Sequence, residues 1–287
     1  MTDGVVYEAG WTLDDVDWSR FDASKTSPAL LAAVKAASLV EYNAPDYVAY
    51  LKRVYRGAPE STIRRIEQWG EEETQHGLAL ARWAELADPS FDFNRAFARF
   101  RTLYRAAHFE GAQASVRGSR RGEMIARCVV ESGTSSLYSA MRDASDEPVL
   151  KEVAGRIAAD EFRHYRLFYD ILQDETEPDL PLWRKLWVAV SRVQESDDDE
   201  LACAYYCANV PPEDAATTPY RRRVYAKAYQ EKLMAFYRRH HIDRLVKMVA
   251  RPAGLNPSGR LSRIASAVLW RVLRLRGGAA SRGLEPV

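Results

Sequence analysis

Cysteine is scarce in this chain of 287 residues, and it has no long apolar run. Three cysteines, Cys128, Cys203 and Cys207, are too few for a disulfide framework and fit a reducing cytoplasm. The last two share a helix face, which permits a metal or redox pair, but we interpret them as small buried thiols. No uncharged apolar run approaches the roughly 18 residues that a membrane-spanning helix needs. Because the first thirty residues are acidic and lack an apolar segment, we expect no signal peptide and a cytoplasmic protein.

The net charge is only +1, but the charges are unevenly placed along the chain. The segment from Thr218 to Val287 carries 16 of the 41 basic residues and only three of the 40 acidic ones. Such an uneven charge distribution gives information about binding partners and not about the fold. It favours an acidic partner protein, a membrane surface, or a solvated basic face that packs on the acidic remainder. We expect no nucleic-acid partner.

Helical periodicity runs through nearly the whole chain and predicts an all-α protein. Four long helices are expected first, over about 27–56, 61–87, 118–141 and 147–173. Pro45 lies inside the first and either kinks or breaks it, because proline cannot donate a hydrogen bond to the carbonyl of residue 41. Residues 91–116 have helical spacing and belong to a long connection. Further helices are expected over about 181–194, 198–208, 219–249 and 260–276.

The helices divide into three predicted segments. Residues 1–26 form an N-terminal extension, 27–175 a four-helix bundle, and 176–287 a basic helical region packed on the bundle. The helix over 260–276 has arginines on one face and aliphatic residues on the other, which also fits a helix lying on a membrane surface.

Two segments follow the pattern Glu-x-x-His, one from Glu73 to His76 and one from Glu161 to His164. Residues three apart lie on the same face of a helix, so each motif aims a carboxylate and an imidazole at one point. A single match of this kind is common by chance. Two matches on long predicted helices indicate a shared metal site.

One further glutamate in helical context precedes each motif, Glu41 before the first and Glu131 before the second. The four positions are separated by 32, 58 and 30 residues, as in two antiparallel helix pairs joined by a longer crossover. Glu131 follows two valines, a setting too apolar for a solvated carboxylate, and an unpaired buried carboxylate is expensive. The alternative interpretation is that Glu41 or Glu131 is a solvated helix residue, in which case a metal site here would hold only one ion.

Two Glu-x-x-His helices and two helices with a single Glu are the ligand set described for ferritin-like four-helix proteins with a di-iron or di-manganese centre. We therefore predict a ferritin-like bundle with a di-metal core and additional C-terminal helices. Carboxylates and imidazoles without thiolates suit iron or manganese. Thr134, one turn after Glu131, places its hydroxyl beside an open metal position or bonds back to the carbonyl of residue 130. The remaining histidines, His108, His240 and His241, are interpreted as surface or hydrogen-bonded residues.

Within these motifs the chain resembles the soluble acyl-ACP desaturases. The segment Trp69 to Gly77 resembles their Glu-Glu-Asn-Arg-His-Gly segment, and Ile157 to His164 resembles their Ile-Ala-Ala-Asp-Glu-Lys-Arg-His segment. Glu41, Pro45 and Tyr47 are similar to the first ligand helix of that family, and Glu131 with Thr134 to its third. The resemblance covers roughly residues 27–175. It departs at Tyr42, where the family usually has a second acid.

This resemblance implies a role for each matched residue. Glu41 and His76 would bind one iron, Glu131 and His164 the other, and Glu73 and Glu161 would bridge both. Asp160 matches an aspartate that holds a ligand histidine. In that family a tryptophan completes the path from this aspartate to the surface, and Trp11 and Trp18 are the candidates here.

The implied activity is an oxygen-dependent desaturation of a fatty acyl chain on acyl carrier protein, with two iron ions and electrons from a ferredoxin-like donor. Manganese is an alternative to iron at the same donors, and a homodimeric assembly is expected. Other di-iron oxygenase reactions stay open, namely hydroxylation, N-oxygenation and aldehyde deformylation. So does a ferritin-like iron-binding role without catalysis.

Overall fold

The computed structural model describes residues 10–104, 112–194 and 199–280, and within these ranges the regular elements are all helices, joined by turns and loops, without a strand. The all-α prediction is thereby confirmed for the part of the chain described. The bounds of the α-helices are α1 Pro28–Tyr42, α2 Ala44–Val54, α3 Glu60–Ala87, α4 Phe93–Leu103, α5 Arg120–Ala144, α6 Pro148–Asp174, α7 Leu182–Gln194, α8 Asp199–Asn209, α9 Arg222–Met234, α10 Arg239–Ala250 and α11 Arg260–Ala280. No helix in these ranges has both the length and the apolar character needed to cross a membrane.

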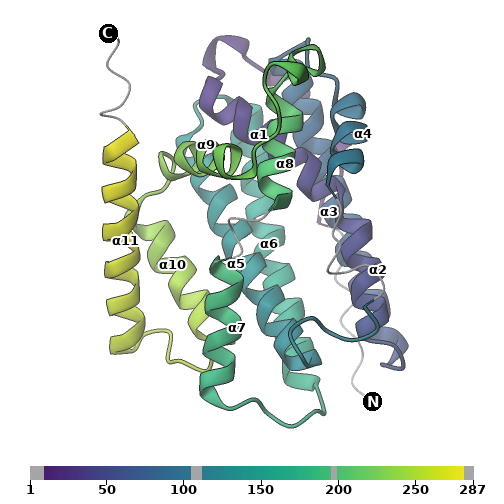
Figure 1. Cartoon of the computed structure of the whole chain (residues 1–287), viewed down its shortest axis with the longest axis vertical. Coiled ribbons are helices and arrows are strands. Elements are labelled where there is room, and N and C mark those ends of the chain that lie inside the picture. The colour runs from purple at the N-terminus through teal and green to yellow at the C-terminus, as the bar shows by residue number, and fades with distance from the viewer. Residues whose placement is uncertain (1–9, 105–111, 195–198, 281–287) are drawn as a thin grey trace.

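Four long helices, α1, α3, α5 and α6, form the centre of the molecule (Figure 1). α1 packs along α3, α5 packs along α6, and α3 and α6 meet between the two pairs. The later helices surround them: α8 lies on α1, α9 on α8, α7 and α10 on α5, and α11 on α10. Residues 176–194 and 199–280 thus cover the outside of the central helices, and the described basic side chains of this segment are exposed or half-buried.

Capping residues begin two of the central helices. Ser119 accepts a hydrogen bond from the backbone N–H of Gly122 at the start of α5, as N-cap serines do. At the start of α6, the buried carboxylate of Glu147 accepts from the backbone N–H groups of Val149 and Leu150. It also accepts from the indole N–H of Trp83 at 2.7 Å, which ties α6 to α3. Charge-assisted bonds of this kind offset the cost of burying the carboxylate.

The predicted first helix is broken rather than kinked. α1 ends at Tyr42, and α2 begins at Ala44, with Pro45 in its first turn. Asn43 occupies the break, where its side chain donates to Glu200 at 3.0 Å and accepts from Arg101 at 2.6 Å. Proline is tolerated in a first turn, where its missing N–H has no intrahelical partner to lose.

Gly77 on α3 allows the break between α1 and α2 to lie close to α3. A Cβ placed on Gly77 would lie 2.6 Å from the backbone nitrogen of Tyr42, which is far inside contact distance. A residue with a side chain at this position would push α1 away from α3. The close approach sets Glu41, at the end of α1, beside the Glu73–His76 motif.

The predicted helix over 219–249 is wrong as a single element. α9 ends at Met234, α10 starts at Arg239, and Phe236 between them is buried in the core. The interruption allows α9 to pack on α8 while α10 packs on α5. Two smaller corrections concern helix bounds. α3 starts at Glu60, one residue before the expected start at Ser61, and α4 ends at Leu103, while residues 105–111 of the expected helical connection lie outside the described residues.

The apolar core is divided in two by a polar layer. One cluster contains Leu80 and Trp83 of α3, and the other contains Ile66 and Trp69 of the same helix. The Glu73–His76 motif lies between them along α3. The same order occurs on α5 and α6, whose ligand motifs also separate residues of the two clusters. The candidate site is therefore enclosed by apolar side chains above and below.

Candidate metal centre

The six predicted ligands converge in this polar layer, one or two from each central helix. Every one is buried, with a relative exposure of 9% for Glu41 and at most 4% for the others. They form two sets in which the possible ligand atoms lie within 4.8 Å of one another. The first set is Glu41, Glu73, His76 and Glu161, and the second is Glu73, Glu131, Glu161 and His164.

Glu73 and Glu161 belong to both sets, and they lie between the two histidines. The Nδ1 atom of His76 is 3.4 Å from Glu73 Oε2 and 3.3 Å from Glu161 Oε1. The Nδ1 atom of His164 is 3.0 Å from Glu73 Oε1 and 4.0 Å from Glu161 Oε2. Each of the two glutamates therefore turns one oxygen toward each histidine, as a carboxylate bridging two ions would.

Several atoms of these ligands are buried without a hydrogen bond. They are Glu73 Oε2, His76 Nδ1, Glu131 Oε1, Glu161 Oε1 and His164 Nδ1. Buried polar atoms are nearly always paired, because leaving one unpaired costs about 1–3 kcal/mol. Five such atoms directed at one another are accounted for by cations between them, and the donor set of carboxylates and imidazoles fits this purpose. These buried Glu/His clusters could therefore hold metal ions.

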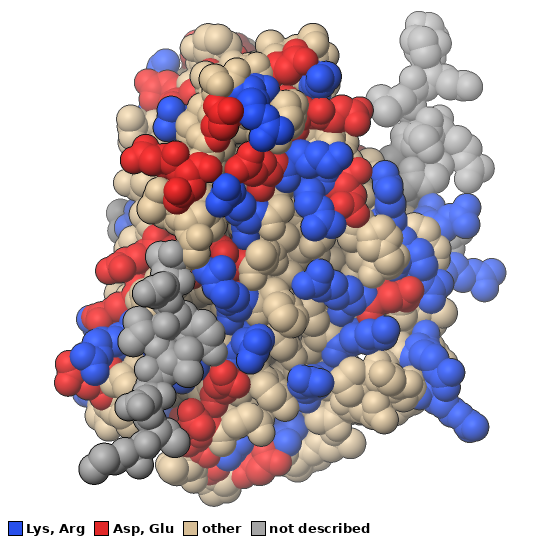
Figure 2. Space-filling view, turned by 180° about the vertical axis from the view of Figure 1, so that it is seen from behind, with Lys and Arg blue, Asp and Glu red and all other residues tan. Residues whose placement is uncertain are grey.

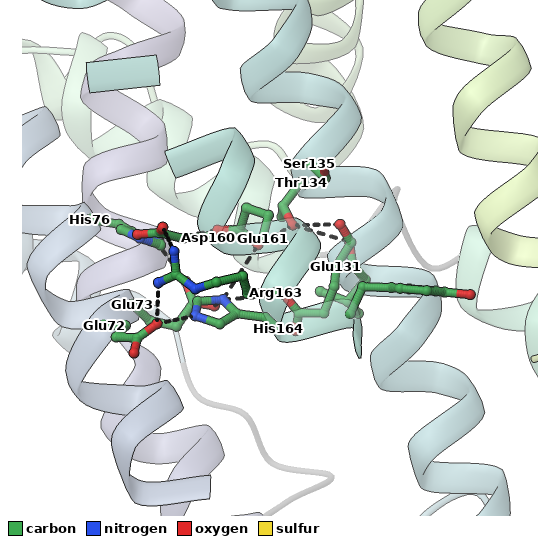
Figure 3. A network of polar contacts seen from close by, with 12 residues as sticks. Glu72, Glu73, His76, Glu131, Thr134, Ser135, Asp160, Glu161, Arg163 and His164 are labelled. Carbon is green, nitrogen blue, oxygen red and sulfur yellow. Dashed lines mark hydrogen bonds and ion pairs between the residues drawn. The ribbon is translucent and has the colours of Figure 1, made fainter. Parts of the chain in front are cut away.

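The outer nitrogens of both histidines are held by carboxylates from the opposite motif (Figure 3). His76 Nε2 lies 3.0 Å from Asp160 Oδ2, and His164 Nε2 lies 2.8 Å from Glu72 Oε2. A proton on Nε2 leaves the lone pair of Nδ1 directed into the cluster, which is the tautomer a metal ligand needs. Asp160 and Glu72 each precede the glutamate of their own motif, so the arrangement is crossed and nearly symmetric.

Arg163 joins the two supporting carboxylates. Its guanidinium donates to Asp160 and, at 3.3 Å, to Glu72 Oε2, and Figure 3 shows it lying between them. Asp160 also accepts the indole N–H of Trp11 at 2.7 Å. Trp18 instead donates to the backbone carbonyl of Leu13, so the structure selects Trp11 from the two candidate tryptophans.

The hydroxyl of Thr134 makes the predicted contact with the carbonyl of residue 130, and it also contacts the carboxylate of Glu161, which the sequence did not predict. Its hydroxyl lies 2.5 Å from Glu161 Oε2 and 3.3 Å from the carbonyl oxygens of Val130 and Glu131. A hydroxyl has a single proton, and the shorter contact makes Glu161 its acceptor. Thr134 is thus in direct contact with one of the two shared glutamates.

Two contacts of the cluster were missed by the sequence reasoning. The Tyr138 hydroxyl donates to Glu41 Oε1, and Glu72 supports His164. Tyr138 lies two helical turns after Glu131 and therefore on the same face of α5, a spacing that was available as a signal. For Glu72 the signal was its position before Glu73, which matches that of Asp160 before Glu161.

The charges of the cluster are compensated by protons. Burial, and then the negative charges of Glu73 and Glu161, raise the pKa of Glu41 and of Glu131 well above the usual range. Burial alone would raise the pKa of Glu73, but the charge of His164 holds it well below the usual range. Burial alone would lower the pKa of His164, yet Glu73 and Glu72 raise it to about 9. Metal ions would take the place of these protons.

A third group, made of Asp143, His240 and His241, is better explained by hydrogen bonding than by metal. The backbone N–H of Arg238 donates to Nδ1 of His241 at 2.9 Å, so the proton of the neutral ring lies on Nε2. That nitrogen lies 3.0 Å from Asp143 Oδ2 and donates to it. Neither ring nitrogen of His241 then offers a lone pair, and the group serves to hold α10 to the end of α5. His108 lies outside the described residues.

The supporting role of Glu72 predicts a measurable change in affinity. Replacing it by alanine leaves His164 Nε2 without its acceptor. Loss of such an outer hydrogen-bond partner of a metal-bound histidine typically lowers metal affinity by about 10–100-fold. We expect Glu72→Ala to lower metal affinity by this factor, measured by competition with a chelator. Glu71→Ala is the control, because Glu71 is exposed on the same helix. Equal affinities of both variants and the wild type would contradict the role of Glu72.

Comparison of the sequence with models of known protein families and with curated proteins yields no match.

Proposed function

We propose that the chain is a ferritin-like, acyl-ACP-desaturase-like oxidoreductase that holds two iron ions and desaturates a fatty acyl chain. One observation supports this above all, namely that Glu73 and Glu161 are shared by two buried ligand sets. A mononuclear site would leave one histidine and one glutamate of the cluster without a role. Manganese fits the same donors and is distinguished by metal analysis.

The proposed roles of the ligands follow from the two sets. Glu41 and His76 would hold one ion, Glu131 and His164 the other, and Glu73 and Glu161 would bridge them. When bound, the two ions would supply the activation of dioxygen that allows hydrogen to be removed from unactivated methylenes. The protein supplies orientation and a dry environment, because the cluster lies between two apolar halves of the core.

Proton and electron supply to this site would use the residues in contact with the ligands. Thr134 is placed to hold a proton beside Glu161, at 2.5 Å from its Oε2. Trp11, Asp160 and His76 form a hydrogen-bonded series from the N-terminal segment to the cluster. We propose a ferredoxin-like protein as the electron donor and acyl carrier protein as the carrier of the acyl chain. Between Thr218 and the start of α11 there are ten basic residues against two acidic ones, which supports an acidic carrier.

The proposed reaction is tested with protein expressed in iron-supplemented medium. The purified enzyme is reduced by a ferredoxin system, mixed with acyl carrier proteins of several chain lengths under air, and its products are analysed by mass spectrometry. A product lacking two hydrogens supports desaturation. A product that has gained oxygen or lost its carbonyl carbon would favour another oxygenase reaction. Oxidation and retention of many irons without an organic product would indicate a ferritin-like binding role.

A threonine variant tests the proton-holding role at the cluster. We expect Thr134→Val to keep both ions but to lower the product formed per dioxygen consumed by about a hundredfold, the lower end of what a positioned proton donor contributes. Ser135→Ala is the matched control, because it also removes a hydroxyl from α5 but one that bonds to the carbonyl of Ala158. Unchanged coupling in Thr134→Val would mean that the threonine only supports the helix.

A further inference from the structure

The face of α11 that packs on the protein is polar in its first two turns and carries the partly buried Leu269 and Leu273 further along. The residues it buries include Ser262 and Ser266, at 3% and 5% exposure. Its aliphatic stripe faces outward, and Leu261, Ile264 and Val268 are 64%, 59% and 57% exposed. An amphipathic helix that only completes a core buries its apolar stripe. α11 departs from that expectation, because the stripe of Leu261, Ile264 and Val268 is left exposed and available to an external partner.

A second helix, α7, which packs on α5, exposes an apolar face as well. Along α7, Trp183, Trp187 and Val190 lie at helical spacing and are 67%, 64% and 52% exposed. The loop that leads into α11 meets the start of α7, where a Cβ on Gly254 would lie 3.2 Å from Leu182 Cδ1. Apolar patches of this extent are uncommon on the surface of monomeric proteins and mark interaction sites.

The charges of these two helices are of one sign. The sequence of α7 contains three basic residues and that of α11 contains five, and neither contains an acidic one. Arg260, Arg263, Arg271 and Arg274 are exposed along α11, on the flank of its aliphatic stripe. In the view from behind, basic side chains gather along the right-hand side of the molecule, where α11 lies (Figure 2). A partner for this face has to be both apolar and anionic.

We propose that the exposed faces of α7 and α11 form a docking surface for an anionic lipid bilayer. Aliphatic side chains and tryptophans would enter the boundary between headgroups and acyl chains, while the arginines would meet the lipid phosphates. The surface lies outside the metal cluster and contains none of its residues.

A second copy of the chain is a poorer occupant. In a twofold symmetric dimer the same patch meets itself, so the arginines of α11 would face those of the other copy without an acidic residue from either helix between them. An acidic carrier protein would satisfy the arginines but leaves no reason for two exposed tryptophans. A bilayer satisfies both features.

The test uses the full-length, metal-loaded protein and sedimentation with vesicles. Binding is expected to vesicles of phosphatidylcholine with phosphatidylglycerol, and to be much weaker with phosphatidylcholine alone. Added salt should weaken binding, because exposed charges are screened over about 8 Å at physiological ionic strength. Tryptophan emission should shift to the blue on binding, as indole rings leave water.

Variants of exposed residues connect the binding to this surface. Trp183→Ser combined with Trp187→Ser should weaken partitioning into the anionic vesicles by at least about tenfold and remove most of the emission shift. Arg263→Gln, Arg271→Gln and Arg274→Gln should each cost about fivefold. The controls are Leu86→Ser and Arg64→Gln, which remove an exposed apolar and an exposed basic residue from α3. Metal content and melting temperature should stay unchanged in all of them.

Three results would overturn the proposal. One is an absence of binding to anionic vesicles by the wild type. Another is equal binding by the α7 and α11 variants and the controls. The third is a loss, in the tryptophan variant, of self-association or of carrier-protein binding while vesicle binding is unaffected, which would assign the surface to that protein partner.

Discussion

Replacing Glu161 by alanine is expected to abolish the dinuclear centre, whereas replacing Glu131 should remove only one ion. Glu161 contributes to both ligand sets, and Glu131 to one. Metal content of protein purified from iron-supplemented medium should fall from about two ions per chain to less than one in Glu161→Ala, and to about one in Glu131→Ala. Mössbauer spectra should lose the signal of magnetically coupled iron in both variants.

The control for this experiment is Asp174→Ala, which removes an exposed carboxylate from the same helix as Glu161. Its metal content should equal that of the wild type. Binding of a single zinc ion by the wild type, with no change in either glutamate variant, would refute the dinuclear site. Glu73→Ala should behave like Glu161→Ala, since Glu73 is also common to both sets.

Removing the metal is expected to destabilise the protein strongly, and more so at high pH. Ligands that bind only the folded state stabilise it by about 4 kcal/mol at a thousand times their dissociation constant. The metal-free site depends on protons instead. Because the pKa values of Glu41, Glu131 and His76 are raised and that of His164 is about 9, the folded state holds more protons than the unfolded state.

The sign of the pH effect follows from these raised pKa values. A group with a raised folded-state pKa stabilises the fold at low pH, and this contribution is lost as pH rises through the folded-state value. For His164 the window is from about 6.5 to about 9, which corresponds to about 3 kcal/mol. The glutamates lose their contribution from about pH 4.5 upward. The pKa of Glu73 is lowered in the folded state, so this residue contributes stability that is lost as the pH falls. That loss occurs only below the usual pKa range of a glutamate.

Thermal melts of chelator-treated and metal-loaded protein at pH 6 and pH 8.5 measure this effect. The difference in melting temperature should be larger at pH 8.5, because bound cations compensate the carboxylates when the protons have left. The exposed-residue variant Glu71→Ala should show the same dependence as the wild type. A difference that is independent of pH would mean that protons do not compensate the charges of the metal-free site.

Four of the six candidate ligands could be paired from the sequence, because each Glu-x-x-His motif is local. Residues three apart on a helix share a face whatever the helix packs against, so Glu73 and His76 needed no tertiary information. Pro45 is also a local signal, and it predicts that the first helix is either kinked or broken. It does not decide between the two, and the structure shows a break at Asn43. The division of 219–249 into two helices was missed, because the residues between α9 and α10 are neither glycine nor proline.

Contacts between different helices could not be predicted from local sequence patterns. The crossed support of His76 by Asp160 and of His164 by Glu72 depends on how α3 and α6 face each other. The choice of Trp11 over Trp18 depends on the path of the N-terminal segment. The aliphatic stripe of α11 was visible in the sequence, but only packing decides whether such a stripe is buried, and here Ser262 and Ser266 occupy the buried side instead.

The helix break at Asn43 makes the two proposed ion positions mechanically unequal. Glu41 is the penultimate residue of α1, and it is the most exposed of the six ligands, whereas the other five lie in the interior of continuous helices. The end of a helix frays more readily than its middle, since its last carbonyl groups lack partners within the helix. We therefore expect an order of ion exchange, in which the ion held by Glu41 and His76 leaves first and returns last. The stiffer position beside Glu131 and His164 would keep its ion through such a cycle and act as the template on which the pair is rebuilt.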